Sequence, residues 1–295
     1  MIYVVWGSTF FFIGQAMSGM PPYLLGALRF SIAGALMLGL AKLSGEQIWH
    51  GKLVLSSWLC GALLLFADML AIMLAQRYIS SSMEAVLAAS TLIWITLLDV
   101  PMWRQHLRRP RVLLGVLGGM GGVLLLYWGH IQEQGDAAAR GMLIFLGGTL
   151  AWSLGSLFSK YKVSGYESVN AWSGTGWQML AAGALFWLCS GCSGEVAAVQ
   201  WGSITLRSWV MLGYLIVFGS MLAYSSYVWL LKIRPATEVG THAYANPFIA
   251  IILGACFGGE VITLSQWLGL SVILICIFLI NKRKEQYVNK ADRAC

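Results

Sequence analysis

The chain has 295 residues, of which 58% are hydrophobic and only 11% are charged, and its formal net charge is +7. A soluble domain carries about a quarter charged residues, so this composition excludes a soluble enzyme and a soluble nucleic-acid-binding domain. Basic residues at the cytoplasmic ends of membrane helices explain the positive charge. The sequence therefore predicts an all-α integral membrane protein.

Ten apolar runs follow one another along the chain with only short connections between them. A helix that crosses the hydrocarbon core of a bilayer needs about 20 such residues. The short alternating segments typical of a membrane β-barrel are absent from the sequence. We expect transmembrane helices at residues 2–18, 22–43, 53–76, 80–101, 111–129, 140–160, 170–190, 208–231, 237–258 and 264–281.

Lys and Arg residues are distributed unevenly between the connections of these helices. With the N-terminus in the cytoplasm, the inner loops and the tail carry 15 of them and the outer loops carry three. Basic residues are retained on the cytoplasmic side of membranes. The sequence thus predicts a multi-pass protein of the inner (plasma) membrane with both termini cytoplasmic. The loop at residues 104–111 is expected inside, and the loop at residues 131–140 outside.

The two halves of the chain resemble each other. We expect one five-helix repeat at residues 1–130, a second at residues 140–285, and a basic cytoplasmic tail at residues 286–295. Because five is an odd number, two such repeats must be inverted relative to each other, as in many transporters. The matched positions occur in the same order in both halves: Trp6 with Trp152, Arg29 with Gln178, Thr91 with Asn246, and Gly115 with Gly269.

The expected ninth helix carries polar side chains in its first half. Thr241, His242, Tyr244 and Asn246 all precede Pro247. A proline cannot donate a backbone hydrogen bond, so a bend and a freed carbonyl are expected one turn earlier. Such groups are tolerated at membrane depth where they face protein or a water-filled cavity. Two interpretations follow: a helix that lines a solute pathway, or a kinked packing helix whose polar groups bond its neighbours.

Ionisable residues within the expected spans, where charge is costly, include Arg29, Asp68, Glu84 and His242. At a rise of ~1.5 Å per residue, Arg29 and Asp68 lie at a similar depth, roughly 10–12 Å below the outer surface. One hypothesis is a static buried ion pair, which Glu84 is placed to join. The other is that Asp68 alternates between a proton and a cationic solute, as acidic residues of membrane pumps do.

Aromatic side chains are also placed well inside the expected spans, at Trp6, Trp94, Trp152 and Tyr244. They either form part of the core or line a cavity for an apolar or aromatic solute. Matched positions in the two halves, such as Trp6 and Trp152, are compatible with the second interpretation.

The one enzyme-like motif in the sequence lacks a suitably placed catalytic partner. The Gly-Cys-Ser-Gly motif at residues 191–194 has the spacing of rhomboid proteases. Its serine is expected near the outer surface, whereas His242 is expected toward the inner one, and a Ser–His pair needs hydrogen-bond reach. We therefore predict no catalytic residues, no metal site and no cofactor.

A run of motifs resembles the EamA family of the drug/metabolite transporter superfamily and, within it, the YedA-like exporters. The resemblance implies ten helices in two inverted repeats, with a central cavity between helices one, three, four, six, eight and nine. It also implies export of small metabolites, and it places Trp6, Ser8, Tyr244 and Asn246 at the cavity. The motifs are VVWGSTFF, PPYLLGALRFSIAGALML, AQRYISSS, LRSWVMLGYLIVFGSMLAYSSYVWLL and AYANPFIAIILG followed by GGE.

The chain departs from the family pattern at several positions. His242 stands where an aromatic residue is usual, Asp68 where a small residue or Asn is usual, and Glu84 where Ala is usual. Leu92 replaces a common proline. These departures concern the solute and the coupling mode rather than the fold.

We therefore expect a secondary transporter that exports amino acids or drug-like, aromatic compounds by alternating access. Its cavity residues are predicted to be Trp6, Ser8, Trp94, Trp152, Tyr244 and Asn246. The expected partners are a small-molecule solute and the lipid bilayer, with no nucleic acid, and the chain is expected to be a monomer, with a homodimer as the alternative. The alternative functions are a flippase for a lipid-linked precursor and a membrane scaffold that transports nothing.

Overall fold

The computed structural model describes residues 1–49, 51–102, 110–163, 171–240, 242, 243, 246, 249 and 264–281. Within these residues the regular structure is entirely helical, with no strand. The predicted all-α class is therefore confirmed. A helix satisfies every backbone hydrogen bond within one segment, which is what hydrocarbon surroundings require.

Four helical segments are long and apolar enough to cross a membrane: Pro22–Leu43, Gly51–Ala75, Asp136–Lys162 and Leu206–Ile233. Three shorter apolar helices accompany them: Ile2–Met17, Met83–Leu98 and Trp267–Cys276. These segments fall within or close to the predicted spans. The expected span 237–258 is described only at residues 237–240, 242, 243, 246 and 249, so most of it lies outside the described residues.

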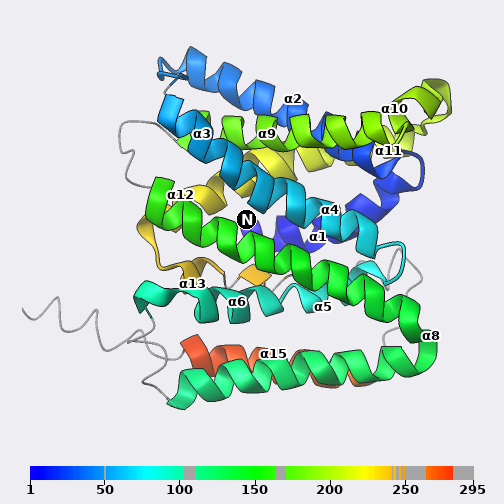
Figure 1. The fold of residues 1–295 in the computed structure, drawn as a ribbon, viewed down its shortest axis with the longest axis vertical. Helices are drawn as coiled ribbons and strands as arrows, with labels where there is room; N and C mark the ends of the chain where they lie inside the picture. Colours follow the sequence, from blue (N-terminus) through cyan, green and yellow to red (C-terminus); the bar gives the residue numbers. More distant parts are fainter. Residues whose placement is uncertain are drawn as a thin grey trace, which may run out of the picture.

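The elements are easiest to follow in two groups along the chain (Figure 1). The first group is α1 (Ile2–Met17), α2 (Pro22–Leu43), α3 (Gly51–Cys60), η1 (Gly61–Ala67), α4 (Asp68–Ala75), α5 (Ser81–Leu87), α6 (Ser90–Leu98), η2 (Val100–Met102), α8 (Pro110–Phe158) and η3 (Ser159–Val163). The second is α9 (Ala171–Cys192), α10 (Glu195–Ala198), η4 (Trp201–Ser203), α11 (Leu206–Tyr214), η5 (Leu215–Tyr224), α12 (Ser225–Ile233), α13 (Ala236–Val239) and α15 (Leu264–Asn281).

Two of the long spans contain a π-helical middle. In the span Gly51–Ala75 this middle is η1, and in the span Leu206–Ile233 it is η5. A π-turn bonds each N–H to the carbonyl five residues back and is often found at functional sites. The wider turn rotates the side chains that follow relative to an ideal α-helix.

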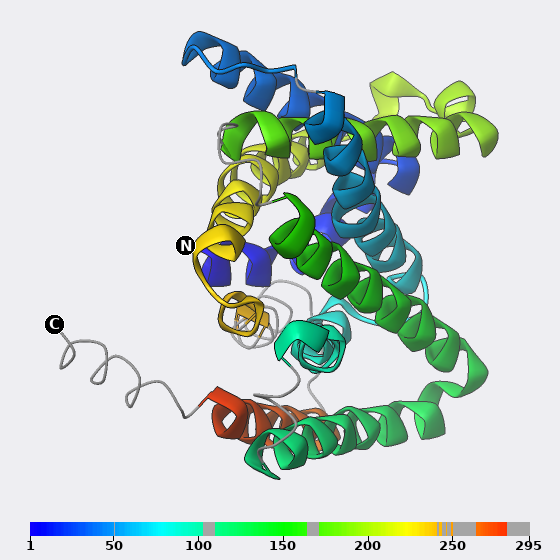
Figure 2. The ribbon, with the colours of Figure 1, turned by 60° about the vertical axis from the view of Figure 1, so that its left-hand side comes forward.

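Residues 131–140, which we expected to form a loop, belong to α8 instead. Figures 1 and 2 show that α8 folds back on itself into two arms. The first arm lies beside α15, where Gly118 meets Cys276, and the second lies beside α4 and α6, where Gly148 meets Ala71. The segment is rich in Ala, Gln and Glu, which favour the helix, so the reversal is made without leaving helical geometry.

Helices α2 and α9 lie side by side and make the most extensive contact between two elements of the described chain (Figure 1). Glycines allow their close approach: a methyl group on Gly34 would lie 2.9 Å from the carbonyl oxygen of Gly176, and one on Gly183 would lie 2.9 Å from the backbone nitrogen of Ser31. At the start of α2, Glu195 Oε2 accepts a hydrogen bond of 3.1 Å from the Leu24 N–H. This carboxylate satisfies one of the free donors at the helix N-terminus.

Candidate functional site

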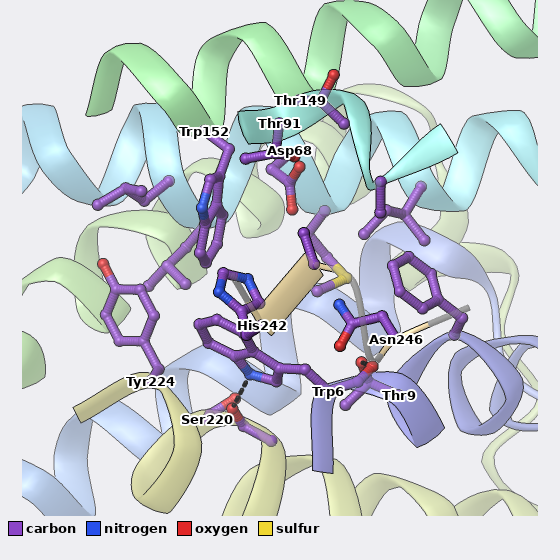
Figure 3. A pocket seen from close by; sticks show the side chains of 18 of the residues that line it. Trp6, Thr9, Asp68, Thr91, Thr149, Trp152, Ser220, Tyr224, His242 and Asn246 are labelled. Atoms are coloured by element: carbon purple, nitrogen blue, oxygen red, sulfur yellow. Dashed lines mark hydrogen bonds between the residues drawn. The ribbon is translucent and has the colours of Figure 1, made fainter. Parts of the chain in front are cut away.

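A central cavity lies between α1, α2, η1, α4, α6, α8 and η5 (Figure 3). The empty space between its side chains measures about 680 Å³, part of which is open to the outside. The lining residues are Trp6, Thr9, Phe10, Arg29, Leu64, Leu65, Asp68, Met69, Ile72, Ala88, Thr91, Phe145, Thr149, Trp152, Gly219, Ser220, Tyr224, His242, Ala243 and Asn246.

Four aromatic rings pack together at one end of this cavity, and we call them the aromatic cluster: Trp6, Trp152, Tyr227 and His242. The Trp6 ring lies 5.2 Å from Trp152, 5.0 Å from Tyr227 and 4.7 Å from His242, measured between centroids. The contacts of Trp6 with Trp152 and with His242 are edge-to-face, an arrangement that aromatic pairs prefer. The two tryptophans that the sequence paired across the halves therefore touch each other.

Hydrogen bonds hold the rings of the aromatic cluster in place. The Trp6 Nε1–H donates to the Gly219 carbonyl (3.2 Å), and the Trp152 Nε1–H donates to the Tyr227 hydroxyl (3.0 Å). The Tyr227 hydroxyl also bonds Ser156 Oγ (2.7 Å). The His242 Nδ1 lies 2.8 Å from the Val239 carbonyl, and because a carbonyl only accepts, Nδ1 carries the proton. Both Trp6 and Trp152 are thus oriented by groups from η5 and α12.

His242 also lines a second, separate space. That space has an empty volume of about 490 Å³ and lies among residues at the start of α1, the end of α12 and α13. Its walls are Ile2, Tyr3, Leu230, Arg234, Glu238, Val239 and His242. His242 is thus the member of the aromatic cluster that lines both the central cavity and this second cavity.

The two oppositely charged residues of the central cavity do not contact each other directly. Arg29 Nε donates to Ser220 Oγ (2.8 Å) and Nη1 donates to Met69 Sδ (3.5 Å). Asp68 is half-buried, lines the same cavity and is electrostatically coupled to Arg29. Within the part of the chain that the structure describes, Asp68 forms no hydrogen bond or direct ion pair.

Asn246 contributes a second polar group with an open hydrogen-bonding position. Its side chain is 4% exposed and lines the cavity. Its Oδ1 is buried and accepts no hydrogen bond from the residues described. A buried polar atom without a partner costs about 1–3 kcal/mol, so such an atom in a cavity marks a place where a ligand donor fits.

Six of the predicted site residues line the central cavity: Trp6, Trp152, Asn246, Arg29, Asp68 and His242. Ser8, Trp94 and Glu84 are placed elsewhere. Ser8 Oγ bonds the Val5 carbonyl and the Tyr214 hydroxyl, both at 2.7 Å. Tyr244 and Pro247 lie outside the described residues.

The other two predicted residues that face away from the cavity also have identifiable surroundings. Glu84 is fully buried and accepts a hydrogen bond of 2.8 Å from Gln76 Nε2. Trp94 lies on α6, and its indole N–H is buried with no acceptor among the described residues. Glu84 is thus bonded to the residue that caps the C-terminus of α4.

Several lining residues were not expected from the sequence. Thr149 on α8 and Ser220 and Tyr224 on η5 face the cavity, and Tyr227 completes the aromatic cluster. The only signal for the last three was their motif, YLIVFGSMLAYSSYVW, which is rich in small and aromatic residues. Among the described residues, no group of three or more His, Cys, Asp or Glu is placed to hold a metal ion.

The sequence matches the EamA-like transporter family twice, over residues 1–128 and 139–282. The chain belongs to this family. The predicted resemblance is thus confirmed, and this EamA-like protein is a membrane transporter.

Named relatives of this EamA-like transporter cover nearly its whole length. The inner membrane transporter YedA of Escherichia coli K12 is 29% identical over 287 residues, which cover 96% of this chain and 89% of YedA. The transporter YvbV of Bacillus subtilis 168 is 25% identical over 298 residues, covering 96% and 90% of the two chains. One solved crystal structure shares the fold with a TM-score of 0.70 over 95% of each chain, at 19% sequence identity.

Proposed function

We propose that this EamA-like protein is an inner-membrane carrier of ten helices, built from two inverted five-helix repeats with both termini cytoplasmic. It exports small organic solutes, such as amino acids or aromatic, drug-like compounds, through the central cavity. The cavity is the observation that carries this proposal. Residues from both halves enclose it, and the matched pair Trp6 and Trp152 meets at its end.

Reciprocal contacts between α2 and α9 support the repeat. Gly34 packs against Leu180, and Gly183 packs against Ser31. Gly34 and Gly183 are 149 positions apart, and so are Ser31 and Leu180. Where two equivalent units meet about a two-fold axis, each contact occurs twice: a residue of the first unit touches a residue of the second, and their equivalents touch in the reverse direction.

The π-helical segments give a second, independent support. They occupy the middle of the span Gly51–Ala75 in the first half and of the span Leu206–Ile233 in the second, and both line the cavity. Under the proposed repeat these spans are the third and the eighth helices, which are equivalent. Thr91 and Asn246, also matched in the sequence, face the cavity as well.

The aromatic cluster supports alternating access. Its member His242 lines both the central cavity and the second cavity, whose walls include Arg234 and Glu238, so the cluster is placed to act as a partition between them. In a carrier whose halves rock about a site near the midplane, one such partition closes while the opposite one opens. We assign the aromatic cluster to the cytoplasmic closure, because positive-inside asymmetry puts Arg234 on that side.

The test is solute retention in cells that overexpress the chain. The proposal predicts that wild type lowers the cytosolic level of at least one small solute and raises it in the medium. Trp152→Ala, at the end of the cavity, should abolish this effect, whereas Trp94→Ala, which changes a tryptophan outside the cavity, should retain it at equal expression. Unchanged solute levels with wild type would favour a scaffold, and movement confined to lipid-linked compounds would favour a flippase.

A further inference from the structure

The two charges of the central cavity are presented to a solute in different ways. The Arg29 side chain is only 4% exposed. Its donors are directed to Ser220 Oγ and Met69 Sδ, and its guanidinium carbon lies 5.0 Å from the centre of the Phe30 ring. Nη2 is directed at Gly219, where a methyl group would come within 3.0 Å of it. The cation is therefore bonded into the wall through Nε and Nη1 and presents little surface to a solute.

Asp68, in contrast, is offered to the cavity. It is half-buried, and Figure 3 shows its carboxylate pointing into the space between Trp152, His242 and Asn246. None of the described residues gives this carboxylate a hydrogen bond or direct ion pair. A carboxylate withdrawn from water is stabilised most by a cation with hydrogen-bond donors.

Asn246 adds a second acceptor to the lining of the same cavity. Its Oδ1 is buried and has no donor from the residues described (Figure 3). An ammonium group has three N–H donors and no acceptor, so it can bond a carboxylate and an amide oxygen at once. Two acceptors to which no described residue donates are complementary to an ammonium group and not to a carboxylate.

The remaining walls define the body that the ammonium group is attached to. Trp6 and Trp152 line the same cavity as the polar groups (Figure 3), and the lining also includes Phe10, Leu64 and Phe145. An aromatic face attracts a cation as well as an apolar ring. These walls fit a hydrophobic or aromatic group of modest size.

We propose that the central cavity selects solutes that carry a protonated amine on an apolar or aromatic body, with Asp68 as the counter-ion and Asn246 as a second acceptor. This inference rests on the proposed function, because it names the solute class of the same cavity. It makes Asp68 a specificity-determining residue: an amine bound there forms the ion pair that Arg29, held in the wall, does not form.

The test is calorimetric titration of purified protein with three probes that share a phenyl ring: phenethylamine, 3-phenylpropan-1-ol and 3-phenylpropionate. We expect phenethylamine to bind at least tenfold more tightly than the acid, with the alcohol in between. Asp68→Asn should weaken phenethylamine at least tenfold and change the alcohol less than threefold. Asp68→Glu, which keeps the charge, should retain most of the preference even if Asp68→Asn folds poorly.

Asp99→Asn is the matched control, because Asp99 is buried, accepts a hydrogen bond of 2.6 Å from the Tyr161 hydroxyl and lies outside the cavity. It should leave all three affinities unchanged. Equal binding of amine and acid, an amine affinity unaffected by Asp68→Asn, or no binding of any probe would overturn the inference. The proposed function has its own test: it is contradicted if overexpression of wild type moves no solute in cells, whichever probe the purified protein binds.

Discussion

Replacing Tyr227 by Phe tests whether the aromatic cluster is held by its hydrogen bonds. Tyr227 is fully buried, and its hydroxyl accepts from Trp152 Nε1 (3.0 Å). It also bonds Ser156 Oγ (2.7 Å), whose own proton goes to the Trp152 carbonyl (2.7 Å). The substitution keeps the ring and its contact with Trp6 but leaves the indole N–H of Trp152 without an acceptor.

The expected cost follows from that single orphaned donor. A buried donor without a partner costs about 1–3 kcal/mol. Tyr214→Phe is a matched control: the Tyr214 hydroxyl bonds Ser8 Oγ (2.7 Å), which in turn donates to the Val5 carbonyl, so no donor is orphaned. A single hydrogen bond lost in a membrane protein costs only about 0.6 kcal/mol on average.

Unfolding free energies measured by steric trapping in bicelles can resolve this difference. We expect Tyr227→Phe to lower the unfolding free energy by about 1–3 kcal/mol and Tyr214→Phe by about 0.6 kcal/mol. An equal loss of unfolding free energy in the two variants would refute the reasoning. It would show that the Trp152 N–H finds another acceptor, or that its hydrogen bond to Tyr227 does not stabilise the protein.

Two further predictions concern packing and pH. Gly34→Ala should destabilise the protein by about 1–3 kcal/mol, because its methyl group meets the Gly176 carbonyl at 2.9 Å. Gly39→Ala should stabilise it by about 0.5–1 kcal/mol, because nothing lies within 4 Å of the added methyl group. A loss of stability at both positions in the unfolding assay would contradict the described packing. Burial raises the pKa of Glu195 above its ordinary value of 4.5, and this effect exceeds the lowering of the pKa by the backbone N–H of Leu24. Wild type should therefore lose stability relative to Glu195→Gln as pH rises above 4.5. A difference in melting temperature between the two proteins that does not change with pH would refute this.

The sequence predicted the composition of the cavity better than its geometry. Trp6 and Trp152 could be identified because the same residue type recurs in corresponding motifs. Ser8 is expected near Trp6 by its motif, but α1 is apolar on every side, so periodicity could not tell which face looks inward. Ser8 in fact bonds Tyr214 on α11.

Ser220 and Tyr224 were missed for a different physical reason. They lie in η5, where the π-helical geometry changes the number of residues per turn. A period of 3.6 residues therefore assigns the wrong face to side chains that follow. The partner of Arg29 was missed for the same reason, because Ser220 reaches it from that segment.

Among the described residues, most of the helices were predictable. Their length and apolar character are set by composition, and the bounds of α1, α2 and α15 agree with the expected spans to within a few residues. The expected loop at residues 131–140 was the exception, since good helix formers allow α8 to continue through the reversal. Local composition does not specify where a chain with high helix propensity folds back.

Chemical modification inside the cavity tests the central claim most directly, that this space is the path of the solute. In a variant whose six cysteines are replaced by alanine, cysteine is introduced at Thr149, which lines the cavity, or at Ser153, which lies one turn further along α8 and does not. Solute export by cells is measured before and after treatment with a water-soluble methanethiosulfonate. We predict that export by Thr149→Cys stops on treatment and that export by Ser153→Cys continues. Export that persists after confirmed labelling of Thr149→Cys, or that stops equally in both variants, would contradict the account.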